Sequence, residues 1–253
     1  MNVTADSFSD GGQFLDADRA IAHGLKLRDD GADFIDVGGE STRPGSIPVS
    51  VDEELERVVP VIEALAARGA AVSVDTSKPE VMRAAIGAGC AMVNDVNGFR
   101  AEGAIDAVSK ANDVDLVVMH MKGTPATMQQ DPQYDDVVAE VSAFLLARAR
   151  ALEAAGVQRQ RIILDPGFGF GKTVEHNKQL LHALPRLAAL GYRVLAGLSR
   201  KKMLGDFTGR PANDRAAASV AAALLAVQNG ASLVRVHDVR ETVDAINVWL
   251  ALR

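Results

Sequence analysis

Short apolar runs rich in β-branched residues alternate with longer amphipathic segments along the chain. The apolar runs lie at residues 34–37, 71–75, 91–95, 116–120, 161–165, 193–197 and 233–237. Because most of them stay apolar until their last residue or two, they are typical of strands covered on both faces, as in parallel sheets. The amphipathic segments predict right-handed helical crossovers. This alternation favours a (β/α)8 barrel, although periodicity alone also permits an open doubly wound sheet.

The segment after the first apolar run has a clear helical pattern. The residues on one face of this helix are Val51, Leu55, Val58, Val59, Ile62 and Leu65. Ser50 and Glu53 precede that face with the spacing of a capping box, in which each side chain bonds the other residue's backbone N–H. Ser77 and Glu80 have the same spacing before the next helical segment. The sequence therefore predicts a capping box at the start of both helices.

Length and charge limit the class of protein. The 253 residues are enough for one barrel and show no linker, so we expect a single domain over residues 1–253. The net charge of −6 is interspersed, which argues against nucleic acid or an anionic membrane as the main partner. Cys90 is the one cysteine, so no disulfide forms within the chain. Since no signal peptide or long apolar run is found, we expect a cytoplasmic protein.

Polar side chains end nearly every apolar run. They are Asp36, Asp75, Asn94, Asp95, His120, Asp165, Ser199, Arg200, Lys201, Arg235 and His237. One aspartate at a strand end is equally well explained by a helix N-cap or a turn. Seven successive strands with such an ending indicate a site, because the carboxyl ends of barrel strands meet at one mouth. We interpret His120 as a hydrogen-bonded strand-end residue rather than a catalyst.

Two of these carboxylates need partners. Asp75 and Asp165 end hydrophobic strands, where a buried charge is costly unless it is paired or hydrogen-bonded. Lys201 and Arg235 are candidates for direct pairing with them. A ligand with several N–H donors is an alternative that can coexist with such pairs.

Three glycine-containing segments follow strand ends. Residues 164–173, LDPGFGFGKT, do not form a nucleotide P-loop, because Pro166 stands where that motif needs glycine; their glycines permit a tight loop close to a ligand. Residues 38–45, GGESTRPG, offer hydroxyls and the guanidinium of Arg43, which suit a phosphate or diphosphate. Residues 2–12, NVTADSFSDGG, occupy the place of the first strand-to-helix loop. The chain has no HExxH, no paired-cysteine spacing and no GxSxG, which weakens zinc and serine hydrolase interpretations.

Seven segments together resemble the dihydropteroate synthases across essentially the whole chain. In chain order they are NVTADSFSDGG, IDVGGESTRPG, SVDTSKPEV, VNDVNGF, LDPGFGFGKT, LSRKKML and VRVHDV. The resemblance implies a TIM barrel that condenses 6-hydroxymethyl-7,8-dihydropterin diphosphate with 4-aminobenzoate, giving 7,8-dihydropteroate and diphosphate in folate biosynthesis. It also implies assistance by Mg²⁺, inhibition by sulfonamides that mimic 4-aminobenzoate, and a homodimer. The last two helices are candidates for its interface, although an apolar helix face is equally explained as part of the core.

The resemblance also assigns roles to residues of this chain. The pterin pocket takes Asp75, Asn94, Asp165 and Lys201. The diphosphate takes Thr42, Arg235 and His237, and the last two form the catalytic set with Lys201. The 4-aminobenzoate site takes Arg43, Ser199, Phe8 and Pro44. Asn2 is the residue linked to Mg²⁺.

The chemistry of these residue types agrees with the implied reaction. One edge of a pterin ring presents an amino group and a ring N–H, and a carboxylate such as Asp165 accepts both hydrogen bonds at once. The arylamine nucleophile is already neutral at about pH 7, so no strong general base is needed. Because a dihydropterin delocalises positive charge on its exocyclic carbon, our hypothesis is that diphosphate leaves before the arylamine attacks.

The chain departs from the family pattern at its start. It begins at Met1 and Asn2, so we expect the first barrel strand to be largely missing. An open barrel exposes strand edges and loses core packing, which would lower stability and alter the placement of Asn2. Ala5 stands where the family usually has proline, so we expect a more mobile first loop.

Three other interpretations stay open. A pterin-binding methyltransferase shares the barrel, but it would have no use for residues that face a diphosphate, which are Thr42, Arg43, Arg235 and His237. A non-catalytic paralogue would bind a pterin or a partner protein, and the missing strand is compatible with this. A barrel aldolase would use Lys201 as a Schiff-base lysine, for which Arg200 and the loop motifs give no support.

Overall fold

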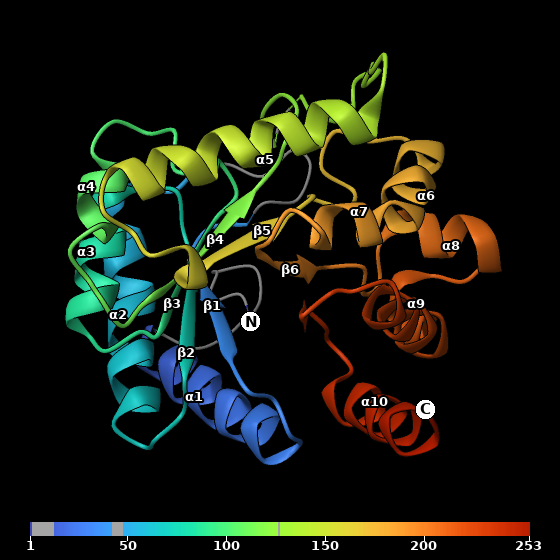
Figure 1. The fold of residues 1–253 in the computed structure, drawn as a ribbon. Coiled ribbons are helices and arrows are strands. Elements are labelled where there is room, and N and C mark those ends of the chain that lie inside the picture. The colour runs from blue at the N-terminus through green and yellow to red at the C-terminus, as the bar shows by residue number, and fades with distance from the viewer. Residues whose placement is uncertain (2–12, 42–47, 126) are drawn as a thin grey trace.

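The computed structural model describes residue 1 and residues 13–41, 48–125 and 127–253. Within them, seven parallel strands form one sheet in the order β1-β2-β3-β4-β5-β6-β7, so each strand lies beside its sequence neighbour. The strands are β1 Ile35–Gly38, β2 Val72–Asp75, β3 Met92–Asp95, β4 Asp115–Met119, β5 Ile162–Asp165, β6 Arg193–Ala196 and β7 Leu233–Val234. Strand order never reverses, as it would in a doubly wound sheet, and the sheet curls as in a barrel (Figure 1).

Met1 lies beside the outer edge of β1. Its amino group donates a hydrogen bond to the carbonyl of Asp36 at 2.5 Å, and its own carbonyl accepts the N–H of Gly38 at 3.0 Å. These two bonds have the pattern of a parallel strand pair. Met1 therefore occupies the position that one more parallel strand would hold next to β1.

The helices pack around the outside of the curled sheet (Figure 1). They are α1 Gln13–Asp29, α2 Val51–Ala66, α3 Pro79–Gly87, α4 Ala104–Val108, α5 Val137–Ala154, α6 Val174–His182, α7 Leu184–Ala188, α8 Lys202–Thr208, α9 Ala216–Gln228 and α10 Val239–Leu252, with 3₁₀ turns at Arg159–Arg161 and Ala212–Asp214. No helix in the described part of the chain is long and apolar enough to cross a membrane.

Of the two predicted capping boxes, one is present. At the start of α2, Ser50 Oγ accepts the N–H of Glu53 at 3.2 Å, and the Glu53 carboxylate accepts the N–H of Ser50 at 3.3 Å. The prediction for Ser77 and Glu80 was wrong, because α3 begins at Pro79 and its N-cap is Lys78. Proline has a fixed φ that suits the first helical position, and it sets this helix start one residue too late for Ser77 to cap it.

Two separate apolar layers hold the sheet in place. The larger one lies between the sheet and the helices, and its biggest fully buried side chains include Ile35, Ile62, Leu116, Leu145 and Ile162. The smaller one lies on the inner face of the sheet and consists of Met92, Val117, Ile163 and Leu195, with Phe34 and Leu233 packed against them. Because side chains alternate along a strand, the residue two places after an inner apolar side chain also points inward, toward the barrel mouth.

Strand β7 is shorter than the predicted run 233–237. It covers only Leu233–Val234, although the N–H of Arg235 still reaches the carbonyl of Ala196 at 3.1 Å. The N–H of His237 bonds instead to the hydroxyl of Ser199 at 3.2 Å. The strand ends early because a side chain, and not the neighbouring strand, satisfies the backbone at His237.

The loop after β5 makes a close backbone approach that only glycine permits. Gly167 has a φ of 67°, a left-handed conformation that L side chains rarely adopt. A Cβ atom at this position would lie 1.9 Å from the carbonyl oxygen of His120 at the end of β4. The tight loop predicted from LDPGFGFGKT is therefore present, and it packs directly on the neighbouring strand end.

We predict that Gly167→Ala destabilises the protein by more than about 2 kcal/mol, because a methyl group adds both backbone strain and a clash. Thermal unfolding should show a Tm lower by about 5 °C or more. The matched control is Gly87→Ala at the end of α3, where an added methyl group meets nothing within 4 Å. The control should leave stability unchanged or raise it by about 0.5 kcal/mol. Equal melting temperatures for the two variants would contradict this account of the loop.

Candidate active site

The carboxyl ends of the strands bring the predicted polar side chains to one mouth. In the parallel register, Gly38 lies opposite Asp75, and Asp75 lies opposite Asn94. Between β4 and β5, Met119 lies opposite Asp165. Asn94, Met119 and Asp165 each follow a residue of the inner apolar layer by two positions, and Asp75 follows the inward-facing Ser73 in the same way, so all four point into the same opening. The structure thus brings together residues that are distant in sequence, as the strand-end pattern predicts.

Asp75 and Asn94 form a polar pair at the ends of β2 and β3. The amide of Asn94 is fully buried and donates to Asp75 Oδ1 at 2.8 Å. Burial raises the pKa of Asp75 to about 7, and the nearby charge of Asp36 acts in the same direction, against the opposing effects of Arg235 and Asn94. Asn94 Oδ1 is buried and has no partner among the described residues. The pair therefore presents an acceptor, and a carboxyl group that titrates near neutrality, to an incoming ligand.

Arg235 pairs with Asp36 rather than with Asp75 or Asp165. Its Nε lies 3.4 Å from Asp36 Oδ2. Burial disfavours the charge of Arg235, but the carboxylates of Asp36, Asp75 and Asp165 outweigh burial and raise its pKa. Asp36 Oδ1 is buried without a hydrogen-bond partner in the described part of the chain. We named Asp36 as a strand-end residue but missed it as a site residue. It lies opposite Ser73, one inward position before the level of Asp75, and its charge within an apolar run was the available signal.

Asp165 and Lys201 are connected through the glycine loop. Asp165 Oδ1 accepts the N–H of Gly167 at 2.7 Å. The ammonium of Lys201 donates to the carbonyl of Phe168 in the same loop. Burial lowers the pKa of Lys201 to about 8, the charge of Asp165 partly compensates, and that of Arg235 lowers it further. The expected direct pairing of Lys201 with Asp75 or Asp165 is replaced by a bond to backbone, so the alternative of N–H donors on a ligand gains support.

Ser199 and His237 form a second polar pair on the β6 and β7 side of the mouth. Ser199 is buried, and its Oγ lies 2.9 Å from His237 Nδ1 and 3.2 Å from the backbone N–H of His237. One hydroxyl thus holds both the ring and the backbone of His237. This contact sets the direction of the histidine at the rim of the mouth.

The turn that presents Ser199 and Lys201 is held by the residue between them. Arg200 has a φ of 57°, which is unusual for a residue other than glycine. Its guanidinium contacts both carboxylate oxygens of Asp238, at 2.5 and 3.2 Å, and its N–H donates to Ser219 Oγ at 2.9 Å. The ion pair with Asp238 and the hydrogen bond to Ser219 together stabilise a backbone conformation that Arg200 would otherwise avoid.

Two other strand-end residues bond within the protein. His120 Nδ1 lies 3.0 Å from the ammonium of buried Lys172, and burial lowers the pKa of His120 to about 3 and that of Lys172 to about 7. Asp95 accepts the N–H groups of Asn97 and Phe99, both at 2.7 Å, so it supports the turn after β3. For Asp95, the alternative of a turn-forming aspartate is the one that the structure shows.

An apolar wall completes the mouth beside Asp165. It consists of Val96, Met119, Met121 and Met128, with Phe170 packed against them. The ammonium of Lys201 lies 4.5 Å from the centre of the Phe170 ring, a cation–π distance. Carboxylate and amide acceptors next to polarizable methionines suit a flat heterocycle with N–H groups on one edge.

Several predicted site residues lie outside the described residues. They are Asn2, Phe8, Thr42, Arg43 and Pro44. In the part of the chain that the structure describes, no three His, Cys, Asp or Glu side chains gather closely enough to hold a metal ion. A metal that binds mainly through phosphate oxygens and water does not need such a cluster.

Comparison with known proteins gives a consistent result. Residues 1–237 match the family of pterin binding enzymes. The chain is 47% identical over 252 residues to the dihydropteroate synthase of Haemophilus influenzae, with 99% of this chain and 91% of the relative covered. It is also similar to two structures of Xanthomonas albilineans dihydropteroate synthase. The complex with 4-aminobenzoic acid is 56% identical with a TM-score of 0.93, and the complex with 7,8-dihydropteroate is 54% identical with a TM-score of 0.90; each covers 99% of this chain and 90% of that one.

We predict that Asp75→Asn changes stability in a pH-dependent way. Asp75 has a folded-state pKa of about 7, above its ordinary value of 3.8, so the unfolded chain loses this proton first as pH rises. The contribution of Asp75 to the stability of the wild type therefore falls between about pH 4 and about pH 7, and the neutral asparagine avoids this loss. The Tm of Asp75→Asn relative to the wild type should be higher at about pH 8 than at about pH 4.

The control for this prediction is Asp244→Asn on exposed α10, which removes one carboxylate far from the mouth. Its Tm difference from the wild type should be the same at both pH values. A pH-independent difference for Asp75→Asn as well would show that the carboxyl group is not raised in pKa by its surroundings.

Proposed function

Because the chain belongs to the family of pterin-binding enzymes that contains the dihydropteroate synthases, we propose that it condenses 6-hydroxymethyl-7,8-dihydropterin diphosphate with 4-aminobenzoate. The products are 7,8-dihydropteroate and diphosphate, which makes the protein a transferase of folate biosynthesis. The observation that carries the proposal is the shielded set of acceptors at the mouth, formed by Asp75, Asn94 and Asp165.

Recognition of the pterin rests on matching its N–H groups to these acceptors. Asp165 is 3% exposed and holds one oxygen on the glycine loop, which leaves its carboxylate oriented at the mouth. The free oxygen of Asn94 and the carboxyl group of Asp75 accept further donors. An analogue without the N–H groups would leave buried acceptors unpaired, and this penalty is a strong basis for selectivity.

Departure of the diphosphate calls for positive charge and hydrogen-bond donors near the leaving oxygen. Arg235 stays cationic because the surrounding carboxylates raise its pKa, and Ser199 holds His237 at the same side of the mouth. Lys201 supplies a further ammonium next to the pterin pocket. We infer that these donors stabilise the developing negative charge and that departure runs ahead of attack. The arylamine then attacks the exocyclic carbon and loses its proton to solvent or to the released diphosphate.

The second substrate is proposed to be 4-aminobenzoate, and sulfonamides are proposed to compete for its place. Ser199 is the described residue that the resemblance assigns to this site, and its hydroxyl lies at the rim beside His237. The remaining assigned residues are Phe8, Arg43 and Pro44, which lie outside the described residues. The complex of a 56% identical synthase with 4-aminobenzoic acid supports this choice of substrate.

Mg²⁺ is proposed as the metal of the reaction, bound with the diphosphate. At the mouth, the buried Oδ1 of Asp36, which has no partner among the described residues, lies near the positive charge of Arg235. A diphosphate bound together with Mg²⁺ also carries both signs of charge and therefore suits this site. Mg²⁺ commonly keeps several waters and binds through substrate phosphates and one or two protein oxygens, of which Asn2 is the proposed one. Its chemistry there would be to neutralise charge on the leaving group.

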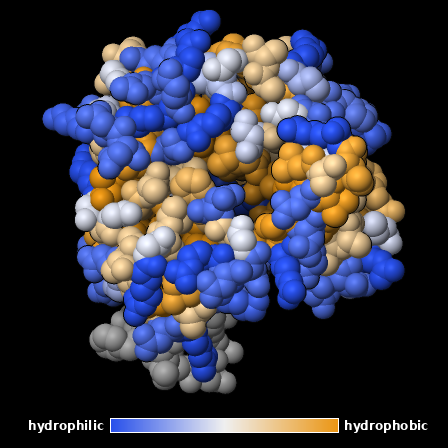
Figure 2. All heavy atoms as spheres, turned by 60° about the horizontal axis from the view of Figure 1, so that its bottom comes forward, coloured by the Kyte–Doolittle hydropathy of each residue, from blue (hydrophilic) through white to orange (hydrophobic). Residues whose placement is uncertain are grey.

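A homodimer formed through α9 and α10 is proposed for the assembly. Large apolar side chains exposed on these helices are Leu225, Val248, Leu250 and Leu252, at 49%, 58%, 45% and 82%. A shallow pocket of about 320 Å³ lies between the helices and is lined by Leu224, Val248 and Trp249 among others. Hydrophobic surface gathers on the right of the face in Figure 2, the side on which Figure 1 places both helices. Apolar patches of this kind mark association surfaces.

We propose a cytoplasmic location. The one cysteine, Cys90, is buried as a free thiol, and burial raises its pKa to about 12, so it stays unreactive. A chain without a disulfide is suited to a reducing compartment. Fractionation of the native host would test this location directly.

The assay that tests the function measures diphosphate release from the pterin diphosphate with Mg²⁺, with and without 4-aminobenzoate. We expect release that depends on 4-aminobenzoate and yields dihydropteroate. Asp165→Asn should lower kcat/KM by about 100-fold, because the amide cannot accept two N–H bonds. Arg235→Ala should lower kcat by about 100-fold or more, and Arg235→Lys should recover part of the loss.

The control for these variants is Asp214→Asn, which breaks a surface ion pair with Arg210 that is 61% exposed at both side chains. It should leave kcat and KM unchanged. No turnover by folded wild-type protein, or release that is independent of 4-aminobenzoate, would contradict the proposed reaction.

The assembly prediction concerns the double variant Val248→Asp, Leu252→Asp. Two charges on the apolar face of α10 should shift the protein to a monomer in analytical ultracentrifugation, since burying them is costly. Phe207→Asp on α8 is the matched control, because Phe207 is also exposed, at 56%, but lies on another helix. If the double variant sediments like the wild type, the interface lies elsewhere or the protein is a monomer.

A further inference from the structure

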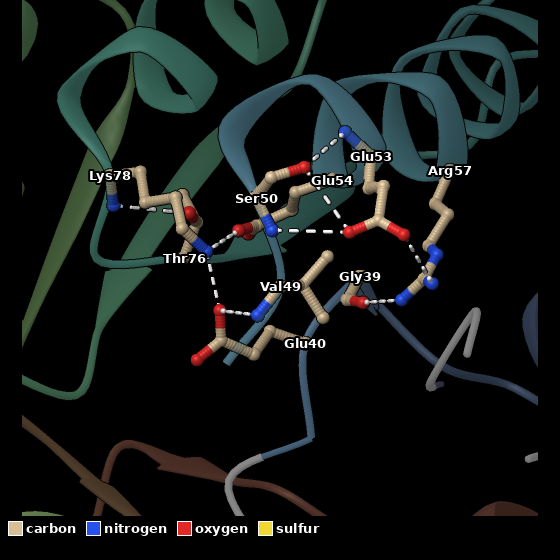
Figure 3. A network of polar contacts seen from close by, with 9 residues as sticks. All are labelled: Gly39, Glu40, Val49, Ser50, Glu53, Glu54, Arg57, Thr76 and Lys78. Carbon is tan, nitrogen blue, oxygen red and sulfur yellow. Dashed lines mark hydrogen bonds and ion pairs between the residues drawn. The ribbon is translucent and has the colours of Figure 1, made fainter. Parts of the chain in front are cut away.

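A cluster of two carboxylates and one ammonium lies just outside the polar mouth. Lys78 donates to Glu40 Oε2 and to Glu54 Oε2 (Figure 3). Glu40 follows β1, Glu54 lies in α2, and Lys78 is the N-cap of α3. One side chain thus connects three elements that the chain reaches at widely separated positions.

Glu40 also joins the two described ends of the β1–α2 connection. Its Oε2 accepts the N–H of Val49 at 3.3 Å, so the carboxylate spans from residue 40 to residue 49. On the same side, Arg57 donates to the carbonyl of Gly39 at 3.0 Å. Gly39 itself packs so tightly on α2 that an added Cβ would lie 2.9 Å from a side-chain carbon of Glu54. Both ends of the connection are therefore fastened to α2 and to Lys78.

The cluster is also joined to the mouth. Lys78 comes three residues after Asp75, and its backbone N–H bonds to the hydroxyl of buried Thr76 at 3.2 Å. Glu40, Glu54, Lys78 and Asp75 line one pocket of about 130 Å³. The cluster therefore lies next to the strand end that carries Asp75.

Stability alone does not explain this choice of residues. Glu54 is 1% exposed, and its Oε1 is buried with no partner among the described residues. Burying a carboxylate with one oxygen unsatisfied is costly, and an apolar contact of similar volume would hold α2 against the sheet at least as well. Burial lowers the pKa of Lys78, but hydrogen bonds and charge from Glu40 and Glu54 outweigh burial and raise it. The ammonium that joins the two carboxylates therefore keeps its positive charge. Because burying Glu54 has this cost, we expect the network to fix the geometry of the β1–α2 connection for function.

We propose that Glu40, Lys78 and Glu54 are positioning residues that fix both ends of the β1–α2 connection against the turn after Asp75. The proposal rests on the proposed function, because the connection carries Arg43 and Pro44 in its sequence. The cluster acts on affinity for 4-aminobenzoate, whereas the pterin acceptors Asn94 and Asp165 belong to other strands and keep their geometry.

The experiment compares Glu40→Gln with Glu53→Gln. Both variants remove one carboxylate near the β1–α2 connection. Glu53, however, is 59% exposed, and its partners among the described residues are Arg57, at 3.9 Å, and the N-cap Ser50 of α2. We expect Glu40→Gln to raise KM for 4-aminobenzoate about 10-fold with kcat changed less than about two-fold. Binding of 6-hydroxymethyl-7,8-dihydropterin, measured by calorimetry, should stay within about two-fold of the wild type.

A double-mutant cycle with Lys78→Met separates positioning from folding. If one network acts, the double variant Glu40→Gln, Lys78→Met has the same KM as Lys78→Met alone, and Lys78→Arg recovers most of the affinity. Lys78→Met leaves Glu54 unpaired, so we expect it to lower Tm. If Lys78→Met does not fold, the KM of Glu40→Gln for 4-aminobenzoate decides whether the proposal holds.

Three outcomes would overturn the inference. In the first, Glu40→Gln has the same KM as Glu53→Gln. In the second, KM, dihydropterin binding and Tm all worsen in parallel, as they would for a purely structural role. In both, normal turnover by the wild type leaves the proposed function intact. Absence of turnover by the wild type itself would overturn the proposed function and, with it, the inference.

Discussion

The two-residue period of a β-strand is the constraint on which the rest of the structure depends. On the inner face of the sheet, Met92, Val117 and Ile163 form an apolar layer, and the next inward position on the same strands carries Asn94, Met119 or Asp165. A strand that slipped by one residue would turn the polar layer outward and leave the mouth apolar. Packing of the helices on the outer face, through Ile35, Val72 and Leu116, holds that register.

Placing charged groups at the end of an apolar barrel has an energetic cost. Asp36, Asp75 and Asp165 share the mouth with Lys201 and Arg235, and burial shifts the pKa of Asp75 up and that of Lys201 down. Only part of this cost is offset within the protein, because oxygens of Asp36 and Asn94 have no partner among the described residues. Groups that are incompletely satisfied in the folded protein suit a ligand that brings N–H donors and its own charges.

The loops that follow the strand ends are held in place by contacts with other elements. Gly167 lets the loop after β5 reach the backbone of β4, while the ion pair of Arg200 with Asp238 holds a strained turn between Ser199 and Lys201. Arg200 adopts a left-handed conformation that its local preference would not select, and these tertiary contacts stabilise it. The Lys78 network differs, because the backbone of Lys78 is in the ordinary extended region and the contact is an ammonium shared by two carboxylates.

Much of the fold and part of the site follow from the sequence alone. Apolar runs of four or five residues, each ended by a polar side chain, predicted the parallel strands and the mouth, because burial on both faces permits few other patterns. Their order in the sheet, which distinguishes a barrel from a doubly wound sheet, came only from the structure. The glycines of LDPGFGFGKT likewise determined a tight loop.

Pairing of charges was decided only by tertiary structure. Arg235 contacts Asp36 and not Asp75, Lys201 bonds to a backbone carbonyl, and Asp95 supports a turn. Lys78 joins residues 38 and 24 positions away, which no periodicity reveals. The physical reason is that hydrophobic patterning depends on which face of an element a residue occupies. A hydrogen bond depends instead on a donor–acceptor distance that must be met to within a few tenths of an ångström by side chains from different elements.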